Sequence, residues 1–324
     1  MLISHLGEKG TETLAPVAEA LAKLLPHVSF CPASTGHEAR AAVRALLPGH
    51  TLVLENLRRH PGEVMNDQMF AKDLAHLGDV FVQDSFDTCH RVHASIVGVP
   101  KFLPSYAGLL VEDEVRELSR ALSPERPSCA IVGGAKFSTK EPVLTTLLQR
   151  YDHVLIGGAL ANDFLKAAGR PVGKSLVGST LAHIQPLLTN SKLMLPVDVA
   201  VAPYTTPAPS NTRIVRVEEV MDDDMILDVG PATITLWRER IRTAKTILWN
   251  GPVGNYERGF ANGTDALAQA VAASDAHSVV GGGDTIASIE RLGLFSKFSF
   301  VSTGGGAMLD FIAKGTLPGI TALG

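Results

Sequence analysis

Residues 279–285 read VVGGGDT, a short apolar run followed by three glycines, an acid and a hydroxyl. β-Branched residues favour a pleated strand, and glycine permits the tight turn that leads from a strand into a helix. Four more runs of this kind lie at residues 130–134 (AIVGG), 154–158 (VLIGG), 247–252 (ILWNGP) and 300–306 (FVSTGGG). The repeated pattern predicts buried strands whose ends carry glycine loops.

The first third of the chain contains strands that end in polar residues, at residues 2–5 (LISH), 51–56 (TLVLEN) and 79–84 (DVFVQD). Between the strands lie windows with a 3.6-residue apolar period, such as residues 14–25 and 111–122. Strands that alternate with helices and are apolar on both faces predict parallel sheets covered by helices on each side.

A helix between two proline-marked breaks separates the two halves of this pattern. Prolines lie at Pro100 and Pro104 before the helix, and at Pro124 and Pro127 after it. Such a helix is typical of a connector between domains. The sequence therefore predicts an α/β protein of two doubly wound, Rossmann-like parallel-sheet domains joined by a hinge helix, with a first domain at residues 1–104 and a second at residues 105–306.

Composition excludes several classes of protein. The 324 residues are 45% hydrophobic and 19% charged with a net charge of −4, so the chain is globular and has no basic surplus for a nucleic-acid partner. No apolar run reaches the roughly 18 residues that span a bilayer, so we expect no membrane partner. Three cysteines, Cys31, Cys89 and Cys129, form no CxxC pair and indicate free thiols in the reducing cytoplasm.

The glycine loops predict a phosphate site. In open parallel sheets, ligands bind beyond the carboxyl ends of the strands, where backbone N–H groups and helix N-termini attract anions. Asp284 and Thr285 add the hard oxygen ligands that Mg²⁺ prefers beside phosphates, and Lys136 and Lys140 add two ammonium groups one helical turn apart. Residues 173–175 (GKS) imitate the end of a Walker A loop, but Ala168 stands where its first glycine belongs.

In this order, the motifs resemble those of the phosphoglycerate kinase family over nearly the whole chain. The matching segments are residues 4–7 (SHLG), 54–58 (LENLR), 77–80 (LGDV), 84–86 (DSF), 90–95 (HRVHAS), 133–136 (GGAK), 249–254 (WNGPVG), 281–285 (GGGDT), 302–307 (STGGGA) and 317–319 (LPG). The resemblance implies a monomeric enzyme that moves a phosphoryl group between 1,3-bisphosphoglycerate and MgADP, giving 3-phosphoglycerate and ATP. It implies that His5, Arg58 and Arg91 hold the phosphoglycerate.

The resemblance also implies roles in the second domain. It places Gly133, Gly134, Ala135 and Lys136 at the nucleotide phosphates, Gly157 and Gly158 at the adenine, Asn250 and Pro252 beside the nucleotide, Glu257 at the ribose, and Gly281, Gly282, Gly283 and Thr285 beside the phosphates. Asp284 is implied as the Mg²⁺ ligand. Lys140 and the N–H groups of Gly304, Gly305 and Gly306 are implied to face the transferred phosphoryl group. Hinge closure is implied to bring the two ligands together, and residues 307–324 to return to the first domain.

The start of the chain departs from the family pattern. Residues 1–7 read as the last half of a buried strand, so we expect a first domain without the family's first strand and helix, in a chain truncated upstream. On that basis we expect MgADP binding with weak or absent turnover. Two alternatives stay open: a non-catalytic MgADP/ATP-binding relative of the kinase, and an unrelated nucleotide-binding α/β protein.

Overall fold

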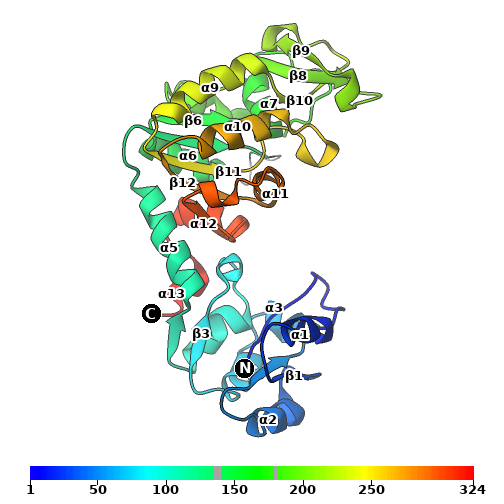
Figure 1. Cartoon of the computed structure of the whole chain (residues 1–324), viewed down its shortest axis with the longest axis vertical. Helices are drawn as coiled ribbons and strands as arrows, with labels where there is room; N and C mark the ends of the chain where they lie inside the picture. The colour runs from blue at the N-terminus through cyan, green and yellow to red at the C-terminus, as the bar shows by residue number, and fades with distance from the viewer. Residues whose placement is uncertain (135–136, 138–139, 179–180) are drawn as a thin grey trace. The chain divides into compact units, whose positions relative to one another are not determined.

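The computed structural model describes residues 1–134, 137, 140–178 and 181–324 (Figure 1). The chain divides into two compact units. Unit 1 comprises Met1–Glu112 and Thr316–Gly324, and unit 2 comprises Asp113–Gly315. The division along the sequence falls inside helix α5 (Leu109–Leu122), the helix that the proline breaks predict as a connector. Among the described residues, no helix is long and apolar enough to cross a membrane.

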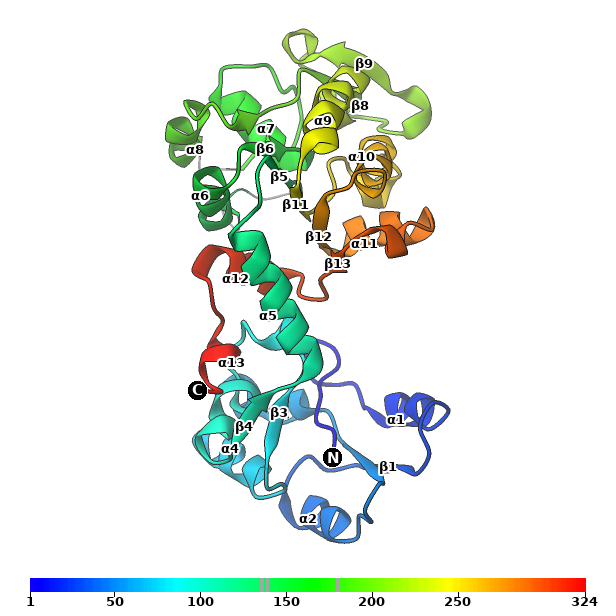
Figure 2. The ribbon, with the colours of Figure 1, turned by 60° about the vertical axis from the view of Figure 1, so that its left-hand side comes forward.

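Unit 2 is built on a six-stranded parallel sheet with the strand order β13-β12-β11-β5-β6-β7 (Figure 2). Its strands are β5 (Ser128–Val132), β6 (His153–Ile156), β7 (Leu193–Met194), β11 (Thr246–Asn250), β12 (His277–Gly281) and β13 (Phe300–Val301). Every residue of β5 and β11 is buried, because helices cover both faces of the sheet. This sheet confirms the prediction of a parallel α/β fold.

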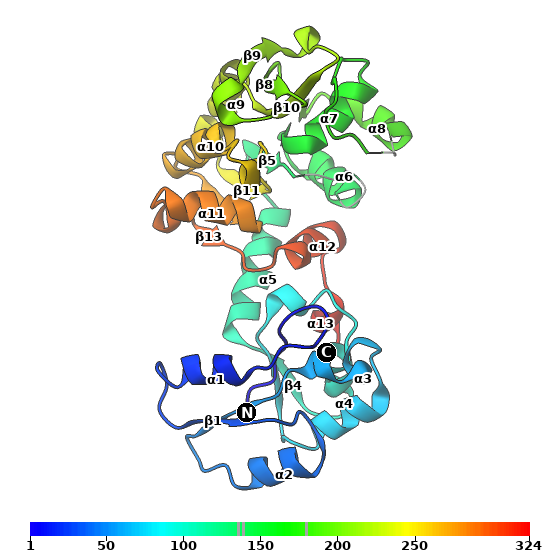
Figure 3. The ribbon, with the colours of Figure 1, turned by 90° about the vertical axis from the view of Figure 1, so that its right-hand side faces the viewer.

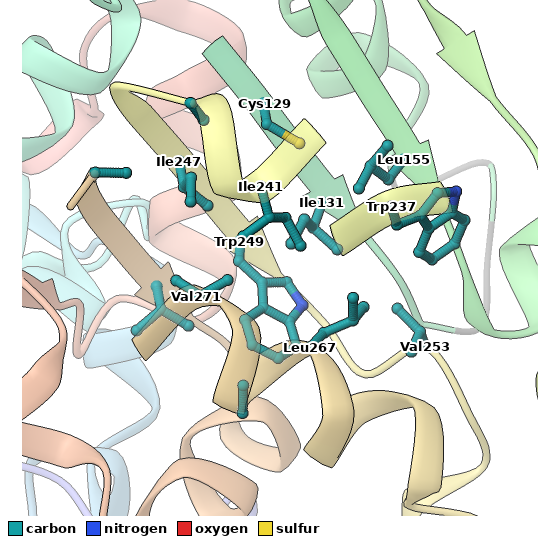
Figure 4. Packing of buried hydrophobic residues seen from close by; sticks show 14 of the residues in the cluster. Cys129, Ile131, Leu155, Trp237, Ile241, Ile247, Trp249, Val253, Leu267 and Val271 are labelled. Carbon is teal, nitrogen blue, oxygen red and sulfur yellow. The ribbon is translucent and has the colours of Figure 1, made fainter. Parts of the chain in front are cut away.

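The helices of unit 2 follow the strands. They are α6 (Glu141–Arg150), α7 (Gly158–Ala167), α8 (Leu181–Leu188), α9 (Pro231–Thr243), α10 (Asn262–Ala272), α11 (Gly283–Arg291) and α12 (Gly306–Lys314). Trp237 and Ile241 of α9 and Leu267 of α10 pack against Trp249 of β11 in an apolar cluster of unit 2 (Figure 4). This core fixes the central strands, and with them the loops at their carboxyl ends.

Unit 2 also contains a three-stranded antiparallel sheet that the sequence patterns did not predict. Its order is β10-β8-β9, with β8 at Asp198–Pro203, β9 at Arg213–Arg216 and β10 at Asp224–Val229. Its own apolar cluster includes Val199, Val201 and Leu165. Prediction failed here because the sequence search followed runs that end in glycine loops, and two of these three strands do not.

Unit 1 contains shorter parallel pairs (Figure 3). β1 (Val28–Cys31) pairs with β2 (Thr51–Leu54), and β3 (Phe81–Gln83) pairs with β4 (Ser105–Ala107). The helices are α1 (Ala15–Leu21), α2 (Gly36–Arg44), α3 (Pro61–Val64), α4 (Gln68–Ala75) and, near the C-terminus, α13 (Pro318–Thr321). The Gly319 N–H donates to the Cys89 carbonyl at 2.8 Å, which ties the C-terminal segment into unit 1.

The strand predicted at residues 2–5 is a bridge rather than a strand. Leu2 pairs in parallel with Val53, through N–H···O contacts of 2.7 and 3.1 Å to Leu52 and Leu54. Further along, the Asn56 side chain takes the place of strand backbone: its Nδ2 donates to the Leu6 carbonyl at 2.8 Å, and its Oδ1 accepts from the Leu6 N–H at 3.3 Å. The regular ladder therefore ends while the chain stays close to β2.

Candidate functional site

The site in unit 2 begins where the order of the parallel sheet reverses. The chain passes from β5 outward to β6 and β7, then returns to β11 on the other side of β5. Loops leave both central strands at this point: the Gly133 N–H donates to the Asn250 carbonyl at 2.9 Å, and the Gly134 N–H donates to the Pro252 carbonyl at 3.0 Å. Such a switch point opens a crevice at the carboxyl edge of a parallel sheet.

Glycine is required in these loops because the backbones approach closely. A Cβ on Gly133 would lie 2.0 Å from the Pro252 carbonyl oxygen. Gly158 has a φ of +65°, and a Cβ there would lie 2.7 Å from the Gly134 nitrogen. Gly157 is the N-cap of α7, and its N–H donates to the Val132 carbonyl at 2.9 Å. The glycines predicted at residues 133–134 and 157–158 therefore lie side by side in space.

A cavity of about 420 Å³ opens at this switch point. Five residues that the resemblance assigns to the nucleotide line it: Gly134, Gly158, Pro252, Glu257 and Asp284. Other parts of its wall come from residues that the sequence analysis missed, including Leu165 of α7 and Leu227 and Asp228 of β10. No sequence signal marked these residues, because apolar side chains of a pocket wall look the same as those of any core.

Lys140 is the buried cation of the site. Its side chain is 7% exposed, and its Nζ donates to Asn250 Oδ1 at 2.9 Å. Burial lowers the pKa of Lys140 to about 8, since a charged amine is poorly solvated there. At pH 7 the amine is still mostly protonated, and an anion placed beside it would regain charge stabilisation. Ala135 and Lys136, which the resemblance places at the phosphates, lie outside the described residues.

The turn from β12 to α11 contains the predicted magnesium and phosphate residues. Gly281 ends β12, Gly282 has a φ of +101°, and α11 starts at Gly283. Asp284 is partly exposed on the cavity. Thr285 is fully buried, and its Oγ1 has no hydrogen-bond partner among the described residues. A buried hydroxyl without a partner is costly, so this turn has capacity for one more polar ligand.

The loop between β13 and α12 contains the three remaining glycines. The Gly304 N–H donates to Ser302 Oγ at 3.1 Å, Gly305 has a φ of +48°, and Gly306 begins α12. Glu114 of α5, which is fully buried, fixes the start of this loop: Oε2 accepts from Ser302 Oγ at 2.7 Å, and Oε1 accepts from the Thr303 N–H at 2.6 Å. The sequence analysis missed Glu114.

In unit 1, cationic and imidazole side chains form a second cluster. Burial and the neighbouring Arg58 and Arg91 lower the pKa of His5, while Asp87 acts in the opposite direction. Burial, Arg58, Arg91 and His5 likewise lower the pKa of His93. Arg58 is oriented by its Nη1, which donates to the Gly7 carbonyl at 2.7 Å. The structure thus brings together all three predicted residues and adds His93, to which the resemblance assigned no role.

Glu63 lies next to His93 of this cluster. Its carboxylate is buried, accepts from Ser95 Oγ at 2.6 Å and from the Ser95 N–H at 3.0 Å, and lies 3.8 Å from His93 Nδ1. Burial raises the pKa of Glu63 in spite of these hydrogen bonds. The contacts hold the segment that follows Arg91 and so help to fix the position of His93.

Taken together, the fold and these residues define an α/β protein with a ligand-sized cavity at the switch point of a parallel sheet. A separate group of arginine and histidine side chains in unit 1 forms a second candidate site for an anion.

Comparison with known proteins agrees with this class. A sequence model of phosphoglycerate kinase matches residues 1–314. Phosphoglycerate kinases of Pelotomaculum thermopropionicum and Thermus thermophilus are 46% and 47% identical over the whole of this chain and 86% of their own length. The chain belongs to the phosphoglycerate kinase family. This result excludes the alternative of an unrelated nucleotide-binding protein.

Solved structures show the same likeness. The phosphoglycerate kinase of Coxiella burnetii matches with a TM-score of 0.86 and 41% identity, covering 99% of this chain and 85% of that one. The enzyme of Pyrococcus horikoshii OT3 matches with a TM-score of 0.87 and 32% identity over the same shares. The two-domain Rossmann-like fold is thereby confirmed, and the chain is a member of a kinase family that uses small-molecule substrates and a nucleotide.

Proposed function

We propose that the chain transfers a phosphoryl group reversibly between 1,3-bisphosphoglycerate and MgADP. The observation that carries this proposal is the cavity of about 420 Å³ at the β5/β11 switch point, with Asp284 and Glu257 on its wall. Its volume lies in the range of pockets that hold small ligands. Family membership supplies the substrates, and the cavity offers a place for the nucleotide.

In this proposal the nucleotide occupies the cavity in unit 2. Glu257 accepts hydrogen bonds from the ribose, Gly157 and Gly158 line the adenine, and the backbone of Gly133 and Gly134 approaches the phosphates. Asp284 ligates the magnesium that accompanies the nucleotide, and Thr285 Oγ1 gains a polar partner there. Among the described residues no group of three His, Cys, Asp or Glu side chains could hold a metal alone. Asp284 therefore fits an ion that keeps phosphate and water oxygens as its other ligands.

The phosphoglycerate is proposed to bind at His5, Arg58 and Arg91, with His93 as a fourth contact. Guanidinium groups match the geometry of phosphate and carboxylate anions. In the forward reaction, the bond between phosphorus and the acyl oxygen breaks, and a bond forms to an oxygen of the ADP β-phosphate. The electron pair stays on the departing carboxylate, which becomes that of 3-phosphoglycerate.

Charge stabilisation is the main contribution expected of the protein. The transferred group spreads negative charge over three oxygens, so fixed donors around it lower the barrier. Lys140 and the N–H groups of Gly304, Gly305 and Gly306 are proposed as these donors, and Glu114 as the residue that positions their loop. We further propose that the protein acts as a monomer in the cytoplasm without nucleic-acid or membrane partners. The net charge of −4 and three buried free cysteines support this setting.

A coupled assay in both directions, together with calorimetric titration of MgADP, tests the proposal. We expect MgADP to bind and the assay to show at most weak turnover, which depends on both substrates. Binding without turnover would instead favour the non-catalytic nucleotide-binding relative. Absence of binding in a correctly folded sample would overturn the placement of the nucleotide in this cavity.

A further inference from the structure

Unit 2 contains a second cavity, of about 360 Å³, that the proposed reaction does not use. It lies where the small sheet of β8, β9 and β10 meets the N-terminal halves of α9 and α10, two helices that lie side by side (Figures 1 and 2). Its size is within the range of sites that bury a small ligand. None of the residues implied by the family resemblance lines it.

Apolar and polar groups share the walls of this second cavity. The apolar part comes from Ile214 of β9, Ile234 of α9, Phe260 in the loop before α10, and Ala266 of α10. Burying a small apolar molecule against such surface is favourable by roughly 25 cal/mol for each Å² removed from water. A small molecule with an apolar body would therefore gain free energy by covering the apolar part of this wall.

One positive charge is available at the edge of this apolar space. Of the described residues that line the cavity, only Asp228 and Arg238 are charged. Asp228 is buried and engaged, since Oδ1 accepts from the Val229 N–H and Oδ2 from the Gly263 N–H, both at 2.9 Å. Arg238 is exposed, and its Nη2 makes a long contact of 3.5 Å to the Ala266 carbonyl. An arginine fork in this position suits a carboxylate or sulfonate.

The second cavity shares a wall with the candidate nucleotide pocket. Asp228 and Val229 line both cavities. Residues 254–258 line the first cavity, and Gly259 and Phe260 line the second, so one short loop separates them. The loop is tightly held, because a Cβ on Gly254 would lie 2.4 Å from the Phe260 carbonyl oxygen and 2.5 Å from Asp228 Cγ. A ligand that presses on Phe260 therefore acts on the loop that carries Glu257.

We propose that this second cavity is a binding site for a small apolar anion, with Arg238 at its charged end, and that its occupancy changes the affinity of unit 2 for nucleotide. The coupling runs through Asp228 and residues 254–260. By thermodynamic linkage, nucleotide then changes the affinity for the apolar anion by the same factor. Couplings of this kind are typically about 5-fold or larger. The binding half of the proposal does not depend on the proposed kinase activity.

Titration with the fluorescent anion 1-anilinonaphthalene-8-sulfonate tests the site on the full chain. Saturating MgADP keeps the probe out of the nucleotide pocket, and we expect binding to persist. Arg238→Gln should weaken it at least 5-fold, whereas the matched change Arg242→Gln, one turn further along α9, should alter it less than 2-fold. The uncharged N-phenyl-1-naphthylamine should not respond to Arg238→Gln.

A filling variant tests the location. Thr235 lines the cavity from an exposed position on α9. The indole of Thr235→Trp should therefore fill the cavity without disturbing the core, and should weaken probe binding at least 10-fold. Ile214→Trp, at a half-exposed position on β9, gives a second filling variant. Probe binding that survives both filling variants, or that ignores Arg238→Gln, overturns the site. A MgADP dissociation constant that changes less than 2-fold between zero and saturating probe overturns the coupling.

Discussion

The two candidate anion sites hold negative charge in different ways. In unit 1, the positive charge comes from side chains, and His5, Arg58, Arg91 and His93 lie close enough to lower the pKa of both histidines. In unit 2, glycine loops bring backbone groups to the cavity, and burial lowers the pKa of the cation Lys140. Burial lowers the pKa values at both sites, and in unit 1 the neighbouring positive charges lower them further.

This difference has a consequence for the empty and occupied states. In unit 1, an anion relieves repulsion among charges that are already present, so its binding favours protonated histidines. In unit 2, an anion would pair with the ammonium group of Lys140, which burial has removed from water. Removing one cation should therefore weaken anion binding less in unit 1, where neighbouring positive side chains remain, than in unit 2.

The largest effect is expected for Lys140→Met. The change removes the buried charge while keeping an unbranched side chain of similar length, so the fold should persist. Loss of one preorganised donor to a charged transition state costs about 10²–10³ in kcat. A coupled assay measures it, with Lys166→Met, an exposed lysine of α7, as the matched control. A loss smaller than 10-fold with unchanged thermal stability would mean that Lys140 does not face the transferred group.

Arg58→Gln should act on unit 1 alone. Because a charge-assisted hydrogen bond contributes about 1.5–3 kcal/mol, we expect the affinity for 3-phosphoglycerate to fall about 10- to 100-fold while that for MgADP stays within 2-fold. Calorimetric titration of each ligand measures both. Arg44→Gln, at the exposed end of α2, is the control.

A second readout separates an electrostatic role of Arg58 from a merely structural one. If Arg58 lowers the pKa of His5 through its charge, Arg58→Gln should raise that pKa in the unliganded protein. An NMR titration of the histidine ring protons shows the shift. An unchanged His5 pKa together with weaker 3-phosphoglycerate binding would point to movement of the loop at Gly7, which Arg58 holds.

The sequence predicted the glycine loops at the carboxyl edge of the unit 2 sheet better than it predicted the walls of the cavity beside them. Strands β5, β6, β11 and β12 were expected because buried parallel strands are short apolar runs and glycine marks their ends. Some of these glycines are required by the local backbone conformation, as the φ of +101° at Gly282 shows. Such local requirements leave a signal in the residue type.

The site residues that the sequence did not predict depend on contacts between segments that are far apart in the sequence. Glu114 reads as one acid in an amphipathic helix, yet it bonds Ser302, 188 residues further along the chain. Leu227 and Leu165 face the cavity, but an apolar residue carries no mark of the space in front of it. His93 lay within a quoted motif, and only its proximity to Arg58 and Arg91 singles it out. Tertiary packing decides all three.

The smallest expected effect is the dependence of ligand affinity on pH, and it contrasts the two sites most directly. The lowered pKa values of His5 and His93 mean that these rings are mostly neutral in the empty site at pH 7, and a bound anion should raise them. The affinity for 3-phosphoglycerate should therefore increase as pH falls from 7.5 to 6, with proton uptake. The affinity for MgATP should instead decrease at high pH, because Lys140 loses its proton above about pH 8 and then no longer attracts the phosphates.

Calorimetric titrations of both ligands between pH 6 and pH 9.5, in buffers of different ionisation enthalpy, measure these changes. We expect a change in affinity of about 3- to 10-fold for each ligand, because the groups at each site change charge only partly over this range. Lys140→Arg keeps its charge throughout this range and should remove the loss of MgATP affinity above pH 8, while leaving the 3-phosphoglycerate profile unchanged. Parallel pH profiles for the two ligands would show that the histidines of unit 1 and Lys140 of unit 2 do not set the two affinities, because imidazole groups and this amine change charge in different pH ranges.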